Sequence, residues 1–210
     1  MSMSKGGCFF TMSVEYLPSK FFKENCRHNP ANDPFYGVIE VTTGNGNAEA
    51  CMREAIENGK KVDVGVQGKQ SNIRRLSSCS IIDTEVSYTS KVIMEAVSEL
   101  NLMFNYELAT IQEILYCEYT VGDYYKMHVD VGEGHHANRK LSLTWNLNPN
   151  EYEGGELCFY QPHLEGGVAQ YKSPNNNIIG FTSWLNHEVK PITFGTRKSI
   201  VAFIGGKAWK

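Results

Sequence analysis

Residues 119–130 read Y-T-V-G-D-Y-Y-K-M-H-V-D, and this stretch contains the most informative pair of side chains in the chain. His128 and Asp130 are two residues apart, and residues i and i+2 of a β-strand point to the same face. If the stretch is a strand, one imidazole and one carboxylate can therefore reach a single metal ion. The pair alone is weak evidence, because a surface strand with two polar residues has the same pattern.

A third metal ligand is available at His187, in the stretch F-T-S-W-L-N-H-E-V-K-P, where Trp184 is expected to pack in the core. Two His and one carboxylate form the facial triad of a non-haem Fe(II) site, which leaves positions on the metal for substrates. Arg197 follows ten residues later, and its guanidinium suits bidentate recognition of a carboxylate. Zinc is the alternative metal, because it also takes His and carboxylate ligands. The nearby His135 and His136 are expected to be solvent-exposed rather than zinc ligands.

This set of residues resembles the 2-oxoglutarate and Fe(II)-dependent dioxygenases, specifically the prolyl 4-hydroxylase-like clade. Every fixed position of the pattern Y-x-x-G-x-x-Y-x-x-H-x-D is met within residues 119–130. The stretches R-K-L-S-L-T-W-N-L-N, E-G-G-E-L-C-F and G-T-R-K-S-I-V follow in the same order and are also similar to that clade. The similarity runs from about Leu108 to Gly206, whereas the N-terminal half resembles no family that can be named.

The resemblance implies roles for the metal ligands and for the residues around a co-substrate. His128, Asp130 and His187 would bind Fe(II) and form the catalytic centre. Arg197 would pair with the distal carboxylate of 2-oxoglutarate, and the hydroxyl of Tyr119 can reach the same carboxylate. O2 would be the second co-substrate, and ascorbate is an optional addition. Conversion of 2-oxoglutarate to succinate and CO2 would then drive hydroxylation of an unactivated C–H bond.

Further contacts are expected on both sides of the metal. Ser199 shares a strand face with Arg197, which makes it a second donor to the co-substrate carboxylate. On the substrate side, the resemblance places Tyr125 next to the metal, and Arg139 matches an Arg that helps to hold substrate in some relatives. A solvated surface Arg is the competing interpretation of Arg139. Related prolyl hydroxylases tend to carry Thr where this chain has Leu157, which leaves the branch of the clade open.

Composition limits the class of protein. A chain of 210 residues suits one domain, so we expect a single domain over 1–210, with a helix-containing support region at 13–107 and the dioxygenase core at 108–206. The formal net charge of −3 argues against nucleic acid as a partner. Without a run of about 18 apolar residues, no membrane span is expected. The six scattered cysteines and the absence of a secretory signal predict reduced, buried thiols and a cytoplasmic protein.

Two helices are expected in the N-terminal half. One covers about Ala48–Asn58 with Asn47 as N-cap, and the other covers about Thr84–Leu100 with Asp83 as N-cap. The second helix carries an apolar face that begins at Val86 and needs a sheet or another helix to cover it. Helices followed by many short strands predict an α+β fold, in which N-terminal helices pack on a cupin-like jelly-roll. The resemblance implies the same double-stranded β-helix.

The remaining elements are short strands joined by polar loops. The expected strands, which are rich in β-branched and aromatic residues, are 37–43, 72–80, 110–119, 141–147, 155–160, 186–190 and 197–204. Residues 133–138 are expected to form a loop at the mouth of the site. The polar, Gly- and Asn-rich stretch 162–177 is expected to form a mobile lid.

The substrate is the least determined feature, because a fold or clade does not define it. The favoured interpretation is a hydroxylase that acts on a prolyl or other side chain of a protein or peptide. Hydroxylation of a free amino acid or another small molecule is the alternative, and oxidation of nucleic-acid bases is disfavoured by the acidic balance. A catalytically silent binding protein on the same fold is also considered. The complete triad and Arg197 argue against a silent binding protein, because a site that no longer catalyses a reaction is free to lose these residues.

Overall fold

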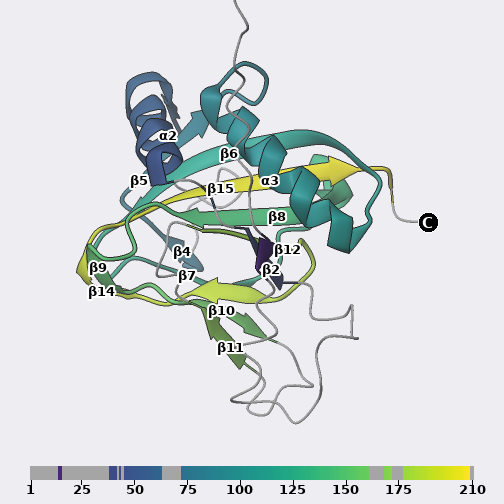
Figure 1. Cartoon of the computed structure of the whole chain (residues 1–210). Coiled ribbons are helices and arrows are strands. Elements are labelled where there is room, and N and C mark those ends of the chain that lie inside the picture. Colours follow the sequence, from purple (N-terminus) through teal and green to yellow (C-terminus); the bar gives the residue numbers. More distant parts are fainter. Residues whose placement is uncertain are drawn as a thin grey trace, which may run out of the picture.

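The computed structural model describes residues 14–15, 38–41, 43, 45–62, 72–160, 168–171 and 177–208. Within this part of the chain, two antiparallel β-sheets face each other, and two helices cover the outer side of the larger sheet (Figure 1). The helices are α2 (Asn45–Asn58) and α3 (Tyr88–Phe104). The arrangement has the helix-on-jelly-roll layers that the sequence predicts.

The strands pair in a crossing order that brings distant segments together. The larger sheet has eight strands in the order β1 (Val14–Glu15), β2 (Val38–Val41), β12 (Ile178–Thr182), β8 (Arg139–Asn146), β15 (Arg197–Gly206), β6 (Leu108–Tyr119), β5 (Ser78–Ile82) and β3 (Lys60–Lys61). The smaller sheet has five strands in the order β11 (Val168–Tyr171), β10 (Leu157–Tyr160), β13 (His187–Val189), β7 (Tyr124–His128) and β4 (Arg74–Arg75). A separate pair consists of β14 (Ile192–Gly195) and β9 (Tyr152–Gly154).

Strand periodicity divides the larger sheet into a helix-side face and an inner face. On β6, Ile114 and Tyr116 belong to the apolar cluster under the helices, whereas Leu115, Cys117 and Tyr119 belong to an inner cluster. The same alternation along β15 puts three apolar residues on the helix side, namely Ile200, Ala202 and Ile204. The odd-numbered residues of β15, including Arg197, Ser199 and Phe203, therefore face the space between the two sheets. This inner space is where the candidate site lies.

Close packing of α3 against β12 depends on a glycine. A Cβ atom at Gly180 would lie 2.6 Å from Cδ1 of Leu100, which is too close for two carbon atoms. Leu100 is fully buried, as are Ile93 and Ala96 on the same face of α3. The missing side chain at Gly180 thus lets the helix approach the sheet, and the apolar stripe of the helix covers the sheet as expected.

Both predicted helix starts are wrong. α3 begins at Tyr88 rather than at residue 84, and its N-cap is Ser87, whose hydroxyl accepts a hydrogen bond of 2.9 Å from the backbone N–H of Ser90. The Asp83 carboxylate instead accepts hydrogen bonds from two N–H groups of a turn that precedes the helix. Val86 lies in that turn and is 77% exposed, so it is not part of the apolar face. Similarly, Asn47 lies inside α2, which starts two residues earlier.

Several strands also differ from their predicted bounds. The stretch 72–80 contains two strands, β4 and β5, which belong to different sheets. β12 and β14 were not predicted, and residues 134–138 form a 3-10 turn, η3 (Gly134–Asn138), rather than an irregular loop. The stretch predicted as a lid includes β11, which pairs with β10, while residues 162–167 and 172–176 of that stretch lie outside the described residues.

Neither described helix is long and apolar enough to cross a membrane. The four cysteines in the described part of the chain are buried and carry free thiols, in agreement with the predicted reduced state. They are Cys51, Cys79, Cys117 and Cys158. The other two cysteines, Cys8 and Cys26, and residues 37 and 42 of the predicted strand 37–43 lie outside the described residues. The predicted boundary between the support region and the core stays a prediction.

Candidate metal centre

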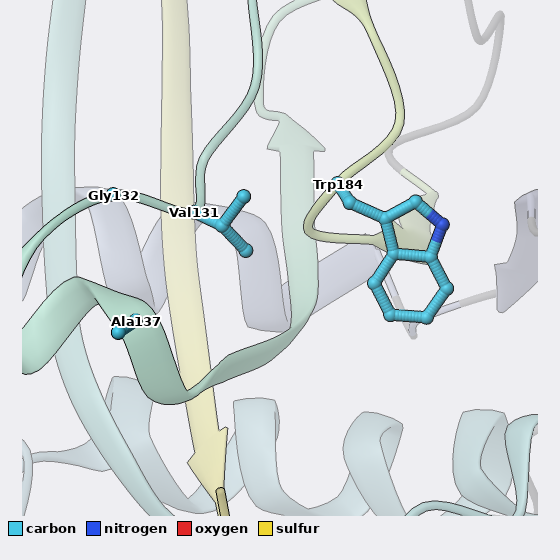
Figure 2. Close-up of a pocket in the computed structure, with 4 residues that line it drawn as sticks. All are labelled: Val131, Gly132, Ala137 and Trp184. Atoms are coloured by element: carbon cyan, nitrogen blue, oxygen red, sulfur yellow. The ribbon is translucent and has the colours of Figure 1, made fainter. Parts of the chain in front are cut away.

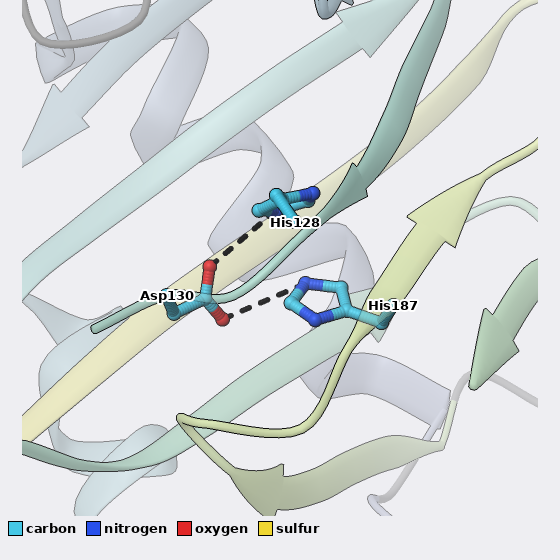
Figure 3. Close-up of side chains that lie close together, drawn as sticks. All are labelled: His128, Asp130 and His187. Atoms are coloured by element: carbon cyan, nitrogen blue, oxygen red, sulfur yellow. Dashed lines mark ion pairs between the residues drawn. The ribbon is translucent and has the colours of Figure 1, made fainter. Parts of the chain in front are cut away.

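Three potential metal ligands converge between the sheets (Figure 3). His128 ends β7 and His187 begins β13, and the two residues lie directly opposite each other in the strand pairing. Asp130 lies between their rings, with Oδ1 3.5 Å from Nε2 of His128 and Oδ2 3.6 Å from Nε2 of His187. The ligand atoms of the three residues all lie within 4.8 Å of one another, so one ion can contact all of them.

The predicted strand geometry for this pair of ligands is wrong in one respect. β7 ends at His128, so Asp130 follows the strand instead of sharing a face with His128. Its position comes from backbone contacts: the N–H of Asp130 donates to the carbonyl oxygen of Ser183 at 2.8 Å, and Nη1 of Arg139 donates to the carbonyl oxygen of Asp130 at 3.3 Å. The stretch that precedes His187 therefore also positions the carboxylate.

The histidine rings are held with their Nε2 atoms toward the carboxylate. Nδ1 of His128 lies 2.8 Å from the carbonyl oxygen of Lys126, and Nδ1 of His187 lies 2.9 Å from that of Leu185. A carbonyl can only accept, so each Nδ1 carries a proton and Nε2 is the ring nitrogen left to bind a metal. This is the tautomer that a metal ligand requires.

Electrostatics favour a charged Asp130 and a neutral His187. Burial alone would raise the pKa of Asp130, but the interactions with His187 and His128 outweigh burial and lower this pKa to about 2. Burial lowers the pKa of His187, and the carboxylate opposes this only in part. Oδ2 of Asp130 is buried without a hydrogen-bond partner. A buried, unpaired carboxylate oxygen beside two imidazole lone pairs fits a divalent cation.

A second polar cluster lies further inside, around Arg197. This buried Arg pairs with Tyr119 across β15 and β6, and Nη1 donates to Oγ of Ser199 at 2.8 Å. Nε of Arg197 has no hydrogen-bond partner, and no carboxylate of the described residues forms an ion pair with the guanidinium. Burial raises the pKa of Tyr119, so its hydroxyl stays protonated and can donate. The cluster thus gathers hydrogen-bond donors and a positive charge that suit an anion.

A cavity of about 610 Å³ reaches Asp130, one of the three potential metal ligands. Its walls include Asp130 and Tyr125, whose ring stacks on that of His128 at 3.5 Å between centroids. Arg139 also lines the cavity, where its guanidinium lies 3.0 Å from a carboxylate oxygen of Glu113 and 3.7 Å from the centre of the Phe203 ring. Tyr125 and Arg139 are therefore both placed where a substrate could contact them.

Comparisons with known proteins agree with this geometry. A family model described as the 2OG-Fe(II) oxygenase superfamily matches residues 114–205. A PKHD-type hydroxylase of Janthinobacterium sp. (strain Marseille) is 30% identical over 161 residues, which cover 70% of this chain and 69% of the relative. The chain belongs to the 2OG-Fe(II) oxygenase superfamily. The predicted resemblance is confirmed.

Other members of the superfamily show the extent of the likeness. A PKHD-type hydroxylase of Synechococcus sp. (strain CC9902) is 32% identical over 117 residues, and the chain spans 51% of that relative's length. Among solved structures, a prolyl hydroxylase from Trichoplax adhaerens, in complex with a peptide fragment of the hypoxia inducible factor oxygen degradation domain, has a TM-score of 0.65 at 18% identity. That likeness covers 82% of this chain and 84% of the other. It confirms the predicted double-stranded β-helix fold.

Membership in the 2OG-Fe(II) oxygenase superfamily implies Fe(II), 2-oxoglutarate and O2 as cofactor and co-substrates. The residues present fit Fe(II) and 2-oxoglutarate. The His128–Asp130–His187 cluster offers two nitrogen ligands and one oxygen ligand, which is the donor set of a facial Fe(II) triad. The guanidinium of Arg197, whose Nε has no hydrogen-bond partner, suits a carboxylate such as those of 2-oxoglutarate.

The structure adds residues that sequence reasoning missed. Arg74, on β4, lines the cavity, with its guanidinium carbon 5.0 Å from the centre of the Tyr125 ring. Asn146 lies opposite Ser199 in the sheet, and its side-chain amide donates to the hydroxyl of Tyr152 at 2.6 Å. Alternation along β8 could have placed Asn146 on the inner face. No local signal could have placed Arg74, because the N-terminal half carries no recognisable motif for this 2OG-Fe(II) oxygenase.

A second cavity, of about 570 Å³, lies beside the loop that follows Asp130 (Figure 2). It is lined by Val131, Gly132, Ala137 and Trp184, and Figure 2 shows the Trp184 indole at one side of it. The expectation that Trp184 packs in the core is wrong, because this side chain is 45% exposed. His135 and His136 line the mouth of the larger cavity and are not part of the three-ligand cluster, so the structure gives no support to a His-rich zinc site within the described residues.

Proposed function

We propose that this protein is a 2-oxoglutarate- and Fe(II)-dependent dioxygenase that hydroxylates an unactivated C–H bond, with release of succinate and CO2. One observation carries the proposal: the Nε2 atoms of two imidazoles and one buried carboxylate oxygen without a hydrogen-bond partner point at a common position beside a cavity. When bound, Fe(II) would supply the activation of O2 with 2-oxoglutarate as reductant. His128, Asp130 and His187 would hold the ion.

The other residues would bind and orient the co-substrate. Arg197 would pair with the distal carboxylate, and Ser199 and Tyr119 would complete its hydrogen bonds. The Tyr119 hydroxyl suits this role because burial keeps it protonated. Arg197 itself is buried, so the ion pair would form away from water and would hold the co-substrate in one orientation.

The substrate side of the cavity would receive a side chain of a protein or peptide, with proline favoured. The relatives that support this are named as PKHD-type hydroxylases, and one structural neighbour holds a peptide fragment. Tyr125 would flank the reacting group, because its ring covers one face of His128. Arg139 would contribute mainly by holding the backbone of Asp130, since its guanidinium is already paired with Glu113.

The metal assignment is tested by anaerobic addition of Fe(II) and 2-oxoglutarate, with the metal-to-ligand charge-transfer band as the readout. The wild-type protein should develop the band and, after O2 is admitted, form succinate. His128→Ala and Asp130→Ala should remove both signals, whereas His136→Ala, a nearby histidine outside the cluster, should retain them. Retention of metal binding and turnover in the first two variants would contradict the assignment.

The substrate class is tested separately with a library of Pro-containing peptides, scored for the mass gain of one oxygen atom. Peptide hits would support the proposal, and hits only among free amino acids and metabolites would replace it with a small-molecule hydroxylase. A protein that binds Fe(II) and 2-oxoglutarate but forms no succinate with any substrate would instead be a silent binding protein.

A further inference from the structure

Two buried thiols touch each other beside the candidate site. Cys79 on β5 and Cys117 on β6 are direct partners in the antiparallel pairing, and their sulfur atoms are 3.7 Å apart. Directly opposed residues of such a pair have Cα atoms about 4.5–5.5 Å apart, which lies within the range of about 4.4–6.8 Å that a disulfide spans. The pair can therefore be bridged with a small movement of the two side chains.

The surroundings of the pair favour reaction rather than simple packing. Nη2 of Arg74 lies 3.5 Å from the sulfur of Cys117, and Cys117 is the strand partner of Ser199, the hydrogen-bond acceptor of Arg197. The hydrogen bond from Cys79 lowers the pKa of Cys117, burial opposes this, and the two guanidiniums lower it further. Cys79 lines the cavity of about 610 Å³, so a small solute can reach Cys79, and the sulfur of Cys117 lies 3.7 Å from that of Cys79.

We propose that Cys79 and Cys117 form an oxidisable dithiol in the wall of the cavity, which hydrogen peroxide closes to a disulfide and thiol reductants reopen. No part of this inference depends on a bound metal. One consequence rests on the proposed function: a co-substrate bound at the metal ligands shields the dithiol from peroxide, because Asp130 and Cys79 line the same cavity and both molecules enter through it.

The reaction balances with hydrogen peroxide as the oxidant. The Cys117 thiolate attacks one peroxide oxygen, so an S–O bond forms, the O–O bond breaks and the leaving hydroxide takes a proton to become water. The sulfur of Cys79 then attacks that of Cys117, so the S–S bond forms, the S–O bond breaks and a second water leaves with the Cys79 proton. Overall, two thiols are oxidised and one peroxide is reduced to two waters.

The test uses the full-length, metal-free protein treated with hydrogen peroxide, then denatured and alkylated with N-ethylmaleimide. Of the six cysteines, two should become resistant to alkylation, and digestion should yield one linked peptide that contains residues 79 and 117. Dithiothreitol should restore both thiols. Cys79→Ser and Cys117→Ser should lose the linked peptide, whereas Cys158→Ser, another buried cysteine, should keep it. Absence of the linked peptide in the wild type, or its presence in Cys79→Ser, would overturn the proposal.

The shielding is tested by the rate of disulfide formation with Mn(II) and 2-oxoglutarate present. At a co-substrate concentration about ten times its Kd, the rate should fall about tenfold, because only the unliganded fraction reacts. The Kd of 2-oxoglutarate is measured independently. A failure of co-substrate binding would count against the proposed function but not against the proposed dithiol, which is tested in the metal-free protein. Co-substrate binding that leaves the rate of disulfide formation unchanged would show that peroxide and the co-substrate do not share an entrance.

Discussion

Among single side chains, Arg197 has the most direct expected effect. A charge-assisted hydrogen bond contributes about 1.5–3 kcal/mol, and truncation would also leave the co-substrate carboxylate buried without its counter-charge. Arg197→Ala should weaken 2-oxoglutarate binding by about 2–4 kcal/mol, or roughly 30- to 1000-fold. Arg197→Lys should weaken binding less, because Lys keeps the positive charge but loses the bidentate geometry of the guanidinium.

The measurement is the Kd of 2-oxoglutarate at fixed Fe(II), and Fe(II) binding itself should survive both substitutions. Lys198→Ala is the matched control, since Lys198 is adjacent but points to the opposite face of β15. A Kd for Arg197→Ala within about threefold of the wild type would show that another residue anchors the co-substrate.

Gly155 lies against the side chain of Arg197. Its φ angle is +65°, and an added Cβ atom would lie 2.5 Å from Cδ1 of Ile192 and 3.1 Å from Cδ of Arg197. Gly155→Ala should therefore lower the free energy of unfolding by about 1–3 kcal/mol and also weaken 2-oxoglutarate binding. Gly46→Ala is the control. An added Cβ atom at Gly46 would meet nothing within 4 Å, and Gly46 lies in a helix, where Ala is favoured over Gly. Thermal unfolding and the Kd of 2-oxoglutarate would check this, and equal stability of the two variants would contradict it.

Among the elements, α3 gives the sharpest stability prediction. Leu100 is fully buried against β12, whereas Leu102, on the same helix, is 76% exposed. Leu100→Ala should lower the free energy of unfolding by about 2–5 kcal/mol, and Leu102→Ala should change it by less than about 0.5 kcal/mol. Denaturant titration of both variants measures this. A loss for Leu102→Ala as large as for Leu100→Ala would mean that the outer face of α3 is covered.

The elements also show where sequence patterns are insufficient. The apolar spacing of α3 is readable from Ile93 to Leu100, but its start depends on whether Asp83 or Ser87 caps it, and both residue types are good caps. The sequence pattern does not predict β12, because both faces of this strand are buried and it shows no alternation of polar and apolar residues. The predicted bounds of β6, which has exposed positions, and of β15, which begins with polar residues on its inner face, lie close to the observed bounds.

For the molecule as a whole, metal binding should add to stability. Two segments far apart in the sequence contribute to the His128–Asp130–His187 cluster, namely β7 with the residues after it and β13, so the site exists only in the folded state. A metal at about 100 times its Kd should add about 2.7 kcal/mol to the free energy of unfolding. Chelation with EDTA should remove this gain, as seen in the thermal midpoint with and without Mn(II). In His187→Ala, the midpoint should no longer respond to EDTA, and a retained response would place the metal elsewhere.

The ligands could be read from the sequence because short spacings along a chain encode local geometry. His128 and Asp130 are close in any conformation that continues the strand, and Arg197 and Ser199 share a face by the two-residue period alone. The alternation of the strands and the helices that precede them likewise predicted the layers of the fold.

Strand pairing lies beyond such local signals, because the partner of a strand depends on packing of the complete chain. Only the tertiary structure sets His187 opposite His128 across two strands of the smaller sheet. It also brings Arg74 and Cys79, from a half of the chain without recognisable motifs, into the cavity that contains Asp130. The residues that line the candidate site therefore come from both halves of the protein, although the sequence pattern of the metal ligands lies in one.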